Sequence, residues 1–466
     1  MSVPDWIHEA IFYQIFPDRF FNGDPENDPP NLQPWGSTPT SWGFQGGDLK
    51  GILQKFDYLL DLGVNAIYLN PIFQASSNHR YNTTDYYRID PKLGTHADFL
   101  ALIDHAHKNN VRIILDGVFN HCGRGFFAFN DLLENQEHSP YRQWYNIMHF
   151  PINAYSVGEA SDYLGWWGMK SLPKFNTNNQ KVRKYLFEVA RYWIEQGADG
   201  WRLDVPNEIN DDSFWAEFRQ VVKSANPEAY LVGEIWSADT RWVGEGHFDG
   251  LMDYPIMDAL TGLLGSNTLD GAHFAEKVEG LLDIYPRENA YAMYLALDSH
   301  DTERILTRLG NNLDKTRLAY LFQFSYPGIP AIYYGDEIGM TGEKDPGCRG
   351  AFPWDESSWN KELRAYLKKL IQLRLSHISL RRGDFVNVRL DANPACYAFL
   401  RKSAEDEVLV MMNASANEQH VTFCSYDIGW NDGRVVTDLL NPSKTYSLQN
   451  NTLEISLPGW GGCWLA

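Results

Sequence analysis

The sequence predicts an α/β protein: a (β/α)8 (TIM) barrel with an excursion after its third strand and a C-terminal antiparallel β-sandwich. Eight short runs rich in β-branched and aromatic residues alternate with helical stretches along most of the 466 residues, as in a closed parallel barrel. A barrel takes roughly 250 residues, which leaves room for an insertion and one small further domain. No GxGxxG motif follows the first run, which disfavours a doubly wound dinucleotide-binding sheet.

Each predicted strand is a short apolar run bounded by polar or turn-forming residues. In chain order the runs are 11–16, 66–70, 111–119, 201–205, 230–236, 250–254, 291–298 and 331–334. The segments between them show helical spacing of apolar residues. The clearest of these helical segments are 49–62, 97–109, 181–196 and 315–324.

Two stretches interrupt this alternation. Residues 122–178 are rich in Gly, Asn and aromatic residues, and they predict an excursion domain that divides the barrel into 1–121 and 179–382. After a helix over 361–376 only short strands follow, which predicts a β-sandwich over 383–466. Its predicted strands are 385–390, 396–401, 408–412, 420–423, 435–440 and 453–457.

Composition excludes several classes of function. The net charge of −20 argues against a nucleic-acid or anionic-membrane partner, since both require a basic surface. No run approaches the ~20 apolar residues of a membrane span, and the first residues lack a signal-peptide pattern. Five scattered cysteines without CxxC spacing predict neither disulfides nor a zinc site. We therefore expect a cytoplasmic protein without an organic cofactor.

Polar residues collect at the carboxyl ends of the predicted strands, where barrel enzymes carry their catalytic groups. Any one of these residues alone is explained equally well as a cap or a turn residue, but their common position favours one active site. They are Asp116, His121, Arg202, Asp204, Glu234, His300 and Asp301.

Local spacing predicts different protonation states for two of the acids. Arg202 lies on the same strand face as Asp204 and should keep it ionised, as a nucleophile requires. Trp236 shares a face with Glu234, and an apolar wall favours the protonated form that a general acid needs. Strands about 4.8 Å apart bring two carboxyls easily to the ~5–5.5 Å separation of retaining glycosidases. The prediction is double displacement on Asp204, with Asp301 holding sugar hydroxyls opposite.

Four segments resemble, in order, the motifs of the α-amylase superfamily: 116–121 (DGVFNH), 200–204 (GWRLD), 234–236 (EIW) and 297–301 (LDSHD). The resemblance implies Asp204 as nucleophile, Glu234 as acid/base and Asp301 as transition-state stabiliser. Segment 78–86 looks like the family loop that supplies a stacking tyrosine. The resemblance thus places Tyr81, Asp116, His121, Arg202 and His300 around the glucose on the non-reducing side of the cleaved bond. Trp236 is a further cleft candidate. Trp166 and Trp167 either line the cleft or fill the core of the excursion.

Two further segments indicate a subfamily. Residues 169–176 (MKSLPKFN) are similar to the excursion signature of neopullulanases, cyclomaltodextrinases and maltogenic amylases. Residues 205–208 (VPNE) resemble their Val-Ala-Asn-Glu, with proline in place of alanine, so the linkage preference stays open. Those enzymes usually carry an N-terminal β-domain that builds a dimer. Here the first strand begins near Ile11, so we expect no such domain. A debranching preference and a homodimer formed in another way both stay open.

Residues 18–28 concentrate Asn and Asp oxygens, the ligands that calcium prefers, although a simple turn cluster explains them as well. Related enzymes bind structural calcium with this loop and a later Gly-Gly-Asp, here 46–48. The resemblance implies the ligands Asn22, Asp24, Asn27, Asp28, Gly46 (through its carbonyl) and Asp48.

The predicted function is hydrolysis of α-1,4 and/or α-1,6 glucosidic bonds in pullulan, maltodextrins, cyclodextrins or branched oligosaccharides. An α-glucan transglycosylase would use the same covalent intermediate and stays open. A non-catalytic carbohydrate-binding or scaffold barrel is disfavoured, because Asp204, Glu234 and Asp301 are all present.

Overall fold

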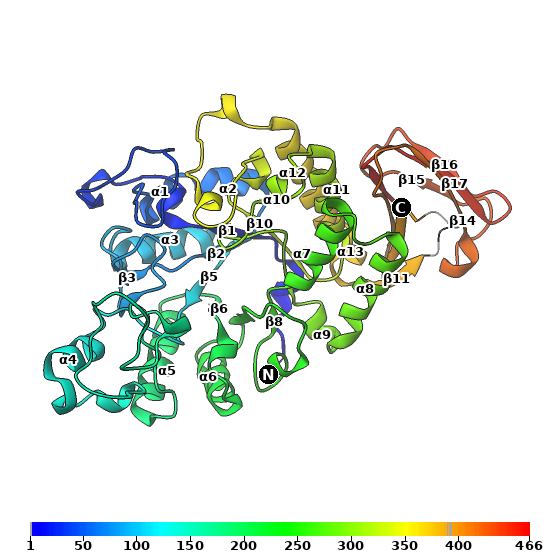
Figure 1. Cartoon of the computed structure of the whole chain (residues 1–466). Helices are drawn as coiled ribbons and strands as arrows, with labels where there is room; N and C mark the ends of the chain where they lie inside the picture. Colours follow the sequence, from blue (N-terminus) through cyan, green and yellow to red (C-terminus); the bar gives the residue numbers. More distant parts are fainter. Residues whose placement is uncertain (1, 389, 391–393) are drawn as a thin grey trace.

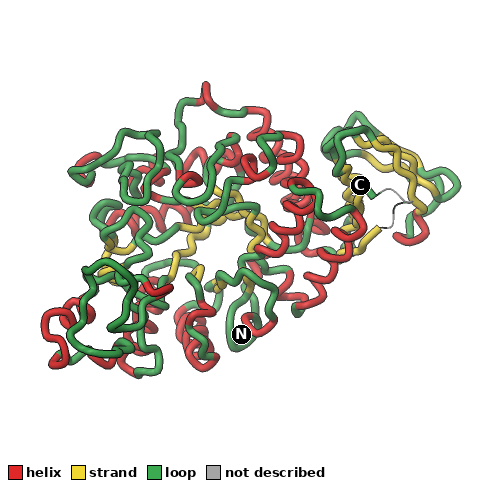
Figure 2. Tube along the Cα trace, in the orientation of Figure 1, coloured by secondary structure: helices red, strands yellow, loops and turns green. Residues whose placement is uncertain are grey.

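The computed structural model describes residues 2–388, 390 and 394–466. Eight parallel strands form one sheet in the order β8-β7-β6-β5-β2-β1-β10-β9. A parallel bridge between Met252 and Tyr294 joins the two end strands, so the sheet closes into the predicted barrel at the centre of Figures 1 and 2. The strands are β1 (Phe12–Ile15), β2 (Ala66–Leu69), β5 (Arg112–Gly117), β6 (Gly200–Leu203), β7 (Tyr230–Gly233), β8 (Gly250–Leu251), β9 (Tyr294–Ala296) and β10 (Ile329–Tyr333).

Helices surround the strands (Figure 2). One predicted helix over 49–62 is divided in two at Lys55, which has non-helical dihedrals (φ −101°, ψ 13°). The barrel helices are α1 (Leu49–Gln54), α2 (Phe56–Leu62), α3 (His96–Lys108), α5 (Gln180–Glu195), α6 (Asp212–Ala225), α7 (Tyr254–Leu260), α8 (Gly271–Ile284), α9 (Arg287–Ala290), α10 (Ile305–Arg308), α11 (Leu313–Ser325), α12 (Lys361–Ser376) and α13 (Ile378–Arg382).

The barrel interior is filled by side chains rather than open. Phe12, Ile114, Val232 and Tyr294 are fully or almost fully buried in one cluster. The short helix η1 (Asp5–Glu9) precedes β1 and adds Ile7 to this cluster. Apolar packing therefore closes the amino end of the barrel, and the polar groups are left at the carboxyl end.

Two insertions lie between barrel strands. The hairpin of β3 (Phe73–Ala75) and β4 (Thr83–Ile89) follows β2 and was not predicted. After β5, residues 122–178 form α4 (Phe127–Asn135) and several short turns tied together by isolated bridges such as Ile147 to Tyr163. This segment lies at the lower left of Figure 1.

The C-terminal strands form a separate unit at the right of Figure 1, with its own apolar core. One sheet has the order β11-β12-β13-β18, and two smaller sheets pair β14 with β17 and β15 with β16. All six predicted strands are present, although positions 389 and 391–393 lie outside the described residues. The strands β16 and β18 were missed. The strands are β11 (Asp384–Val388), β12 (Cys396–Lys402), β13 (Glu407–Asn413), β14 (Gln419–Cys424), β15 (Val435–Thr437), β16 (Thr445–Ser447), β17 (Thr452–Leu457) and β18 (Gly462–Leu465).

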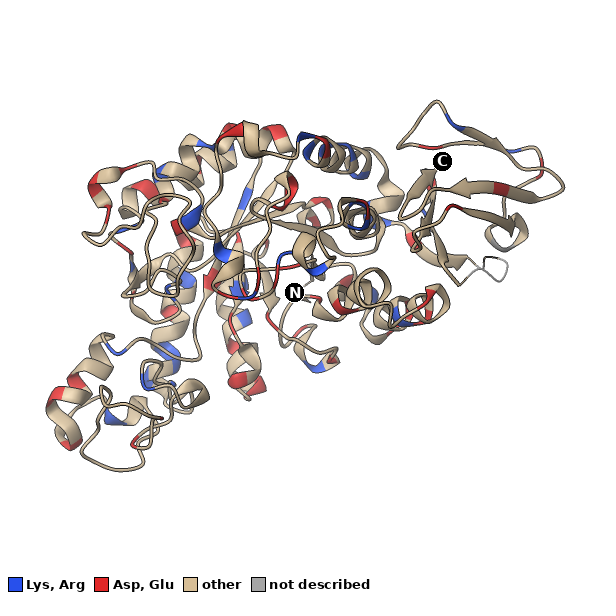
Figure 3. Cartoon of the chain, turned by 45° about the horizontal axis from the view of Figure 1, so that its top comes forward, with Lys and Arg blue, Asp and Glu red and all other residues tan. Residues whose placement is uncertain are grey.

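Figure 3 shows Lys and Arg intermingled with Asp and Glu along the ribbon. None of the helices among the described residues has the length and apolar character needed to cross a bilayer.

Candidate active site

Strand register places two carboxylates side by side. Leu203 at the end of β6 pairs with Gly233 at the end of β7, and the next residues on the two strands are Asp204 and Glu234. The Glu234 N–H donates to the Leu203 carbonyl at 3.0 Å, which continues the ladder past the paired residues. Both carboxylates therefore lie at the carboxyl end of the barrel, as predicted.

Arg202 connects three acids at this end. Its Nη1 lies 3.0 Å from Asp116 Oδ1 and 3.0 Å from Asp204 Oδ1, and its Nη2 lies 3.0 Å from Glu234 Oε1. The side chain is only 1% exposed. Because one guanidinium contacts both Asp204 and Glu234, these two carboxyls are held close together.

The surroundings of Glu234 raise its pKa, as a general acid requires. Burial raises its pKa from 4.5 to about 7 against the opposing effect of Arg202. Trp236 is in contact with Glu234, as predicted, with the polar edge of its indole towards the carboxyl. Trp236 is 49% exposed, stacks on Tyr254 with centroids 3.8 Å apart, and donates from Nε1 to Glu234 Oε1 at 3.3 Å. The Val205 N–H donates to Glu234 Oε2 at 2.9 Å, which fixes the carboxyl on its other side.

The pKa of Asp204 depends on more neighbours than Arg202 alone. Burial, followed by the charge of Glu234, raises the pKa of Asp204 well above its usual value, and Arg202 only partly opposes this. Arg202 favours the ionised form of Asp204, as predicted, but burial and the charge of Glu234 outweigh it, because the one guanidinium is shared among three carboxylates. Asp204 and Glu234 therefore titrate as a pair.

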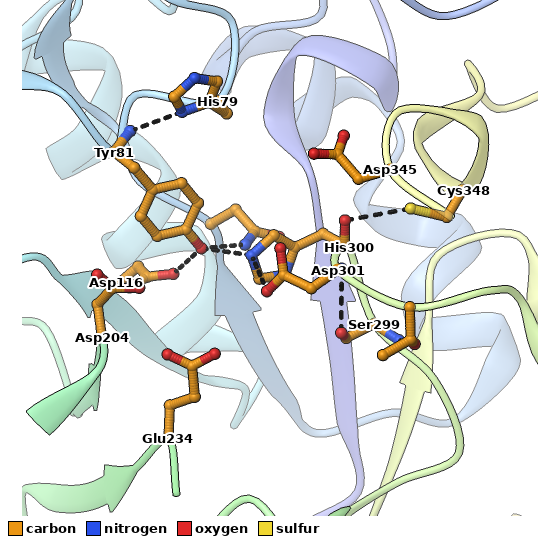
Figure 4. A network of polar contacts seen from close by, with 12 residues as sticks. His79, Tyr81, Asp116, Asp204, Glu234, Ser299, His300, Asp301, Asp345 and Cys348 are labelled. Atoms are coloured by element: carbon orange, nitrogen blue, oxygen red, sulfur yellow. Dashed lines mark hydrogen bonds and ion pairs between the residues drawn. The ribbon is translucent and has the colours of Figure 1, made fainter. Parts of the chain in front are cut away.

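Asp301 lies opposite this pair, in the loop after β9 (Figure 4). Burial favours its protonated form, but the nearby donor His300 and the positive charges of Arg349 and Arg202 together outweigh burial and lower its pKa. Arg349 Nη2 lies 3.2 Å from Asp301 Oδ1, and His300 Nε2 lies 3.0 Å from Asp301 Oδ2. Asp301 is thus the carboxylate of the three whose environment holds it ionised.

The residues expected around the sugar are in direct contact with one another. Tyr81 OH donates to Asp116 Oδ2 at 2.8 Å and lies 2.6 Å from His300 Nε2, and the Tyr81 and His300 rings stack at 5.4 Å (Figure 4). Gln14 Nε2 donates to His300 Nδ1 at 2.9 Å, which leaves the His300 proton on Nε2. Burial lowers the pKa of His300 to about 3, so the ring is neutral.

His121 lies beside this cluster. Its Nε2 is 3.1 Å from the Tyr81 carbonyl oxygen, and burial lowers its pKa to about 3. The structure therefore brings together all nine residues predicted for catalysis and sugar binding.

Several contributors to the site were not predicted. Tyr68 OH donates to Asp116 Oδ2 at 2.5 Å. Its position near the end of β2, beside Asn70, could have identified it as a residue of the site. Arg349 follows β10 in a loop without any recognisable pattern. Val205 was considered in the sequence only as part of the segment 205–208, in which proline follows it. Its left-handed backbone (φ 36°, ψ 52°) is strained for a β-branched residue and directs its N–H to Glu234.

A cavity of about 310 Å³ lies next to Glu234. Its lining includes Trp236, so the half-exposed indole faces both the acid/base candidate and an open space. Apart from the aliphatic Ile235, the other lining residues are polar or aromatic: Asn207, Asn210, Ser237, Asp239, Arg241 and Trp242.

The residues predicted to bind calcium lie in one region but form two groups. Asn22 Nδ2 donates to Asp28 Oδ1 at 2.9 Å, and a Cβ at Gly46 (φ +85°) would lie 2.5 Å from the same oxygen. Asn22 Oδ1 is buried without a hydrogen-bond partner among the described residues.

The second calcium-loop group is already satisfied by nitrogen donors. Asp48 Oδ2 accepts from the Asp24 N–H at 2.8 Å and from the Gly23 N–H at 3.1 Å, and Lys50 Nζ lies 2.5 Å from Asp24 Oδ2. Within the described part of the chain, no group of three or more His, Cys, Asp or Glu residues is arranged to hold a metal ion. Any site here would use the amide and carbonyl oxygens as well.

Comparisons with known proteins agree with this geometry. The family model described as "Alpha amylase, catalytic domain" matches residues 14–377. The chain is 42% identical over 463 residues to Neopullulanase 2 of Thermoactinomyces vulgaris, covering 99% of this chain and 78% of that protein. It is 39% identical over 433 residues to an intracellular maltogenic amylase of Bacillus subtilis, covering 92% and 72%. The solved cyclic α-maltosyl-(1→6)-maltose hydrolase of Arthrobacter globiformis, in complex with that sugar, superposes with a TM-score of 0.91 at 38% identity, covering 100% of both chains. The chain therefore belongs to the alpha-amylase family of glycoside hydrolases.

Proposed function

We propose that this glycosidase hydrolyses α-1,4 and α-1,6 glucosidic bonds of α-glucans by double displacement, with Asp204 as nucleophile, Glu234 as acid/base and Asp301 as transition-state stabiliser. The observation that supports these roles most directly is the register of β6 and β7, which sets Asp204 beside Glu234 under one shared guanidinium. A short separation of two carboxyls is typical of retaining enzymes.

In the first step an Asp204 carboxylate oxygen attacks C1 of the glucose. The bond from C1 to the leaving oxygen breaks, and that oxygen takes the proton of Glu234. In the second step Glu234 accepts a proton from water, whose oxygen attacks C1 and releases Asp204. Two inversions return the product with the α configuration.

The protonation of the pair suits this order. A Glu234 pKa of about 7 keeps a proton available for the leaving group near neutral pH. When Glu234 carries that proton, its negative charge no longer opposes ionisation of Asp204, and Arg202 at 3.0 Å stabilises the Asp204 carboxylate. Shared titration therefore allows one acid and one nucleophile at the same time.

Positive charge develops on the sugar ring as the bond breaks. Asp301 is the acid with a lowered pKa, so its carboxylate is available to stabilise that charge. The Tyr81 ring offers a flat apolar face to the glucose, and neutral His300 offers an Nε2 hydrogen. The cavity beside Trp236 is the natural position of the departing sugar.

The substrate range is also part of the proposal. The names of the relatives include neopullulanase, maltogenic amylase and a hydrolase of a cyclic maltosyl-maltose. We therefore propose pullulan, maltodextrins, cyclodextrins and branched oligosaccharides as substrates, and the cytoplasm as the location. Product analysis on pullulan, β-cyclodextrin, amylose and a branched maltodextrin would rank them. Products longer than the starting oligosaccharide would instead favour transglycosylation.

Mutation tests the roles. Asp204→Asn and Glu234→Gln should each lower turnover by two or more orders of magnitude, since positioned acid–base catalysis alone contributes typically 10²–10⁴-fold. Asp384→Asn, an exposed carboxylate on the C-terminal unit, is the matched control and should keep normal turnover. Turnover near that of the wild type in either active-site variant would contradict the assignment.

We also propose that Asn22, Asp24, Asn27, Asp28, Gly46 and Asp48 hold a structural calcium ion. The unpartnered, buried Asn22 Oδ1 supports this, since calcium prefers such oxygen ligands. Gly46 also leaves no room for a side chain beside Asp28 Oδ1. When bound, the ion would supply only a hard positive charge that fixes the loop after β1. EDTA should lower the melting temperature and leave the initial rate unchanged. An unchanged melting temperature would reject the site.

A further inference from the structure

The indole ring of Trp167 is exposed in a way that packing does not explain. It belongs to the short turn η6 (Trp166–Gly168) of the excursion, and 76% of its surface is exposed. The sequence left open whether this residue fills the core of the excursion or lines the sugar cleft. The structure excludes the core, because a core side chain would be covered.

Trp167 is instead the outer member of a ring stack that begins in the active site. Its centroid lies 4.5 Å from that of Trp166 at an interplanar angle of 15°. Trp166 in turn stacks on His121 at 5.2 Å and 14°. Since His121 contacts the Tyr81 carbonyl at 3.1 Å, near-parallel rings extend from the residues around the cleaved sugar to the solvent.

The backbone of Trp167 adopts an unfavourable conformation in this arrangement. Trp167 has φ 48° and ψ 32°, a left-handed conformation that costs free energy for a residue with a bulky side chain. Hydrogen bonds on both sides keep it there: Met169 N–H donates to the Trp166 carbonyl at 2.9 Å, and Ala160 N–H donates to the Gly168 carbonyl at 2.7 Å. Strained residues of this kind gather at ligand-binding positions, and this one presents a bare aromatic face.

We propose that the exposed face of Trp167 is a glucan-binding subsite outside the cleavage site, which stacks on a glucose unit of longer or branched α-glucans. The proposal rests on the proposed function, because the ligand is a more distant part of the same substrate. Flat aromatic rings provide apolar contact area at little cost in side-chain entropy, and the apolar face of a glucose ring matches such a surface. The ring of Trp166 separates Trp167 from His121, so the sugar bound there is not the one that is cleaved.

Steady-state kinetics on chains of different length tests this. Trp167→Ala should raise KM for maltoheptaose roughly three- to tenfold, the size of effect expected from one ring stack. The same variant should keep kcat within twofold, and it should keep kcat/KM for the shortest maltooligosaccharide that the enzyme cleaves. Trp167→Phe should retain most of the affinity for maltoheptaose. Tyr426→Ala, which removes a 73% exposed ring from the C-terminal unit, is the matched control and should change neither parameter.

A binding measurement separates this subsite from catalysis. In the Glu234→Gln background, maltoheptaose should quench tryptophan fluorescence, and adding Trp167→Ala should remove much of that quenching and weaken binding by the same factor as in kinetics. An unchanged KM with unchanged binding in Trp167→Ala would overturn the subsite even when the wild type is active. Equal losses on short and long chains would overturn it too. A wild type that cleaves no glucan would instead refute the proposed function.

Discussion

Removing Arg202 should alter the acid–base behaviour of the active site as well as its stability. Its guanidinium lies 3.0 Å from oxygens of Asp116, Asp204 and Glu234 and is almost completely buried. In Arg202→Met, three buried carboxyls lose their common positive partner. Losing one partner of a buried ion pair typically costs about 3–5 kcal/mol. The entropy of unfolding is roughly 2.1 cal/mol/K per residue, so each kcal/mol shifts the melting temperature of a 466-residue chain by roughly 1 °C. The melting temperature should therefore fall by about 3–5 °C.

The pH dependence is the more specific part of this prediction. Arg202 lowers the pKa of both Asp204 and Glu234, so both pKa values should rise when it is removed. Asp204 must be ionised to attack, so the acidic limb of kcat/KM should move to higher pH. Glu234 must be protonated, so the alkaline limb, expected near pH 7 in the wild type, should move up as well. The pH optimum therefore shifts towards alkaline pH.

The assay is kcat/KM on a maltooligosaccharide between pH 4 and 10, together with thermal unfolding. Arg183→Met is the matched control, because Arg183 is also buried and paired with two acids, Asp211 and Glu217, but between α5 and α6. It should lower the melting temperature and leave both pH limbs in place. If Arg202→Met reduced activity with both limbs unmoved, the electrostatic reasoning for this site would be refuted.

The remaining predictions concern single groups of the site. The raised pKa of Glu234 means that the folded state binds this proton more tightly than the unfolded state. This proton contributes fully to the free energy of unfolding below about pH 4.5, and its contribution is lost as the pH rises to about 7. The free energy of unfolding changes by about 3 kcal/mol over this range. Glu234→Gln should therefore gain stability relative to the wild type between pH 5 and 8, and parallel melting curves for the two proteins would contradict this. Tyr81→Phe loses the contacts with Asp116 and His300 but keeps the ring. It should therefore reduce kcat/KM about tenfold, with a much larger loss in Tyr81→Ala. Equal kinetics for the two Tyr81 variants would argue against stacking on the sugar.

Much of the barrel could be predicted because the patterns that indicate its strands and helices lie within short stretches of sequence. Each strand is a short buried run, and the eight runs were all found. The residues at the strand ends could be assigned to one face because parallel strands share an edge. The hairpin of β3 and β4 was missed because it interrupts a βα unit with polar, half-buried strands. The strand β16 was missed because its side chains are exposed or half-buried, and β18 was missed because it begins in a Gly-rich segment.

The electrostatics of the site could not be read from local spacing. The neighbour of Asp204 on its strand face is indeed Arg202, but the register also brings Asp116 and Glu234 to the same guanidinium. One positive charge shared by three buried acids lowers the pKa of Asp204 less than burial and Glu234 raise it. Arg349, which contacts Asp301, comes from a loop with no sequence signal. Such contacts depend on tertiary arrangement and appear only when the strands are assembled.

Identification of the covalent intermediate tests most directly whether the enzyme works by double displacement on Asp204. A 5-fluoro glycosyl fluoride should form the intermediate quickly and release it slowly, so that digestion and mass spectrometry locate the bound sugar. We expect one glycosyl group per chain, attached to the peptide that contains Asp204 and absent from Asp204→Asn. A label on any other carboxylate, or hydrolysis to the β anomer without a trapped intermediate, would contradict it.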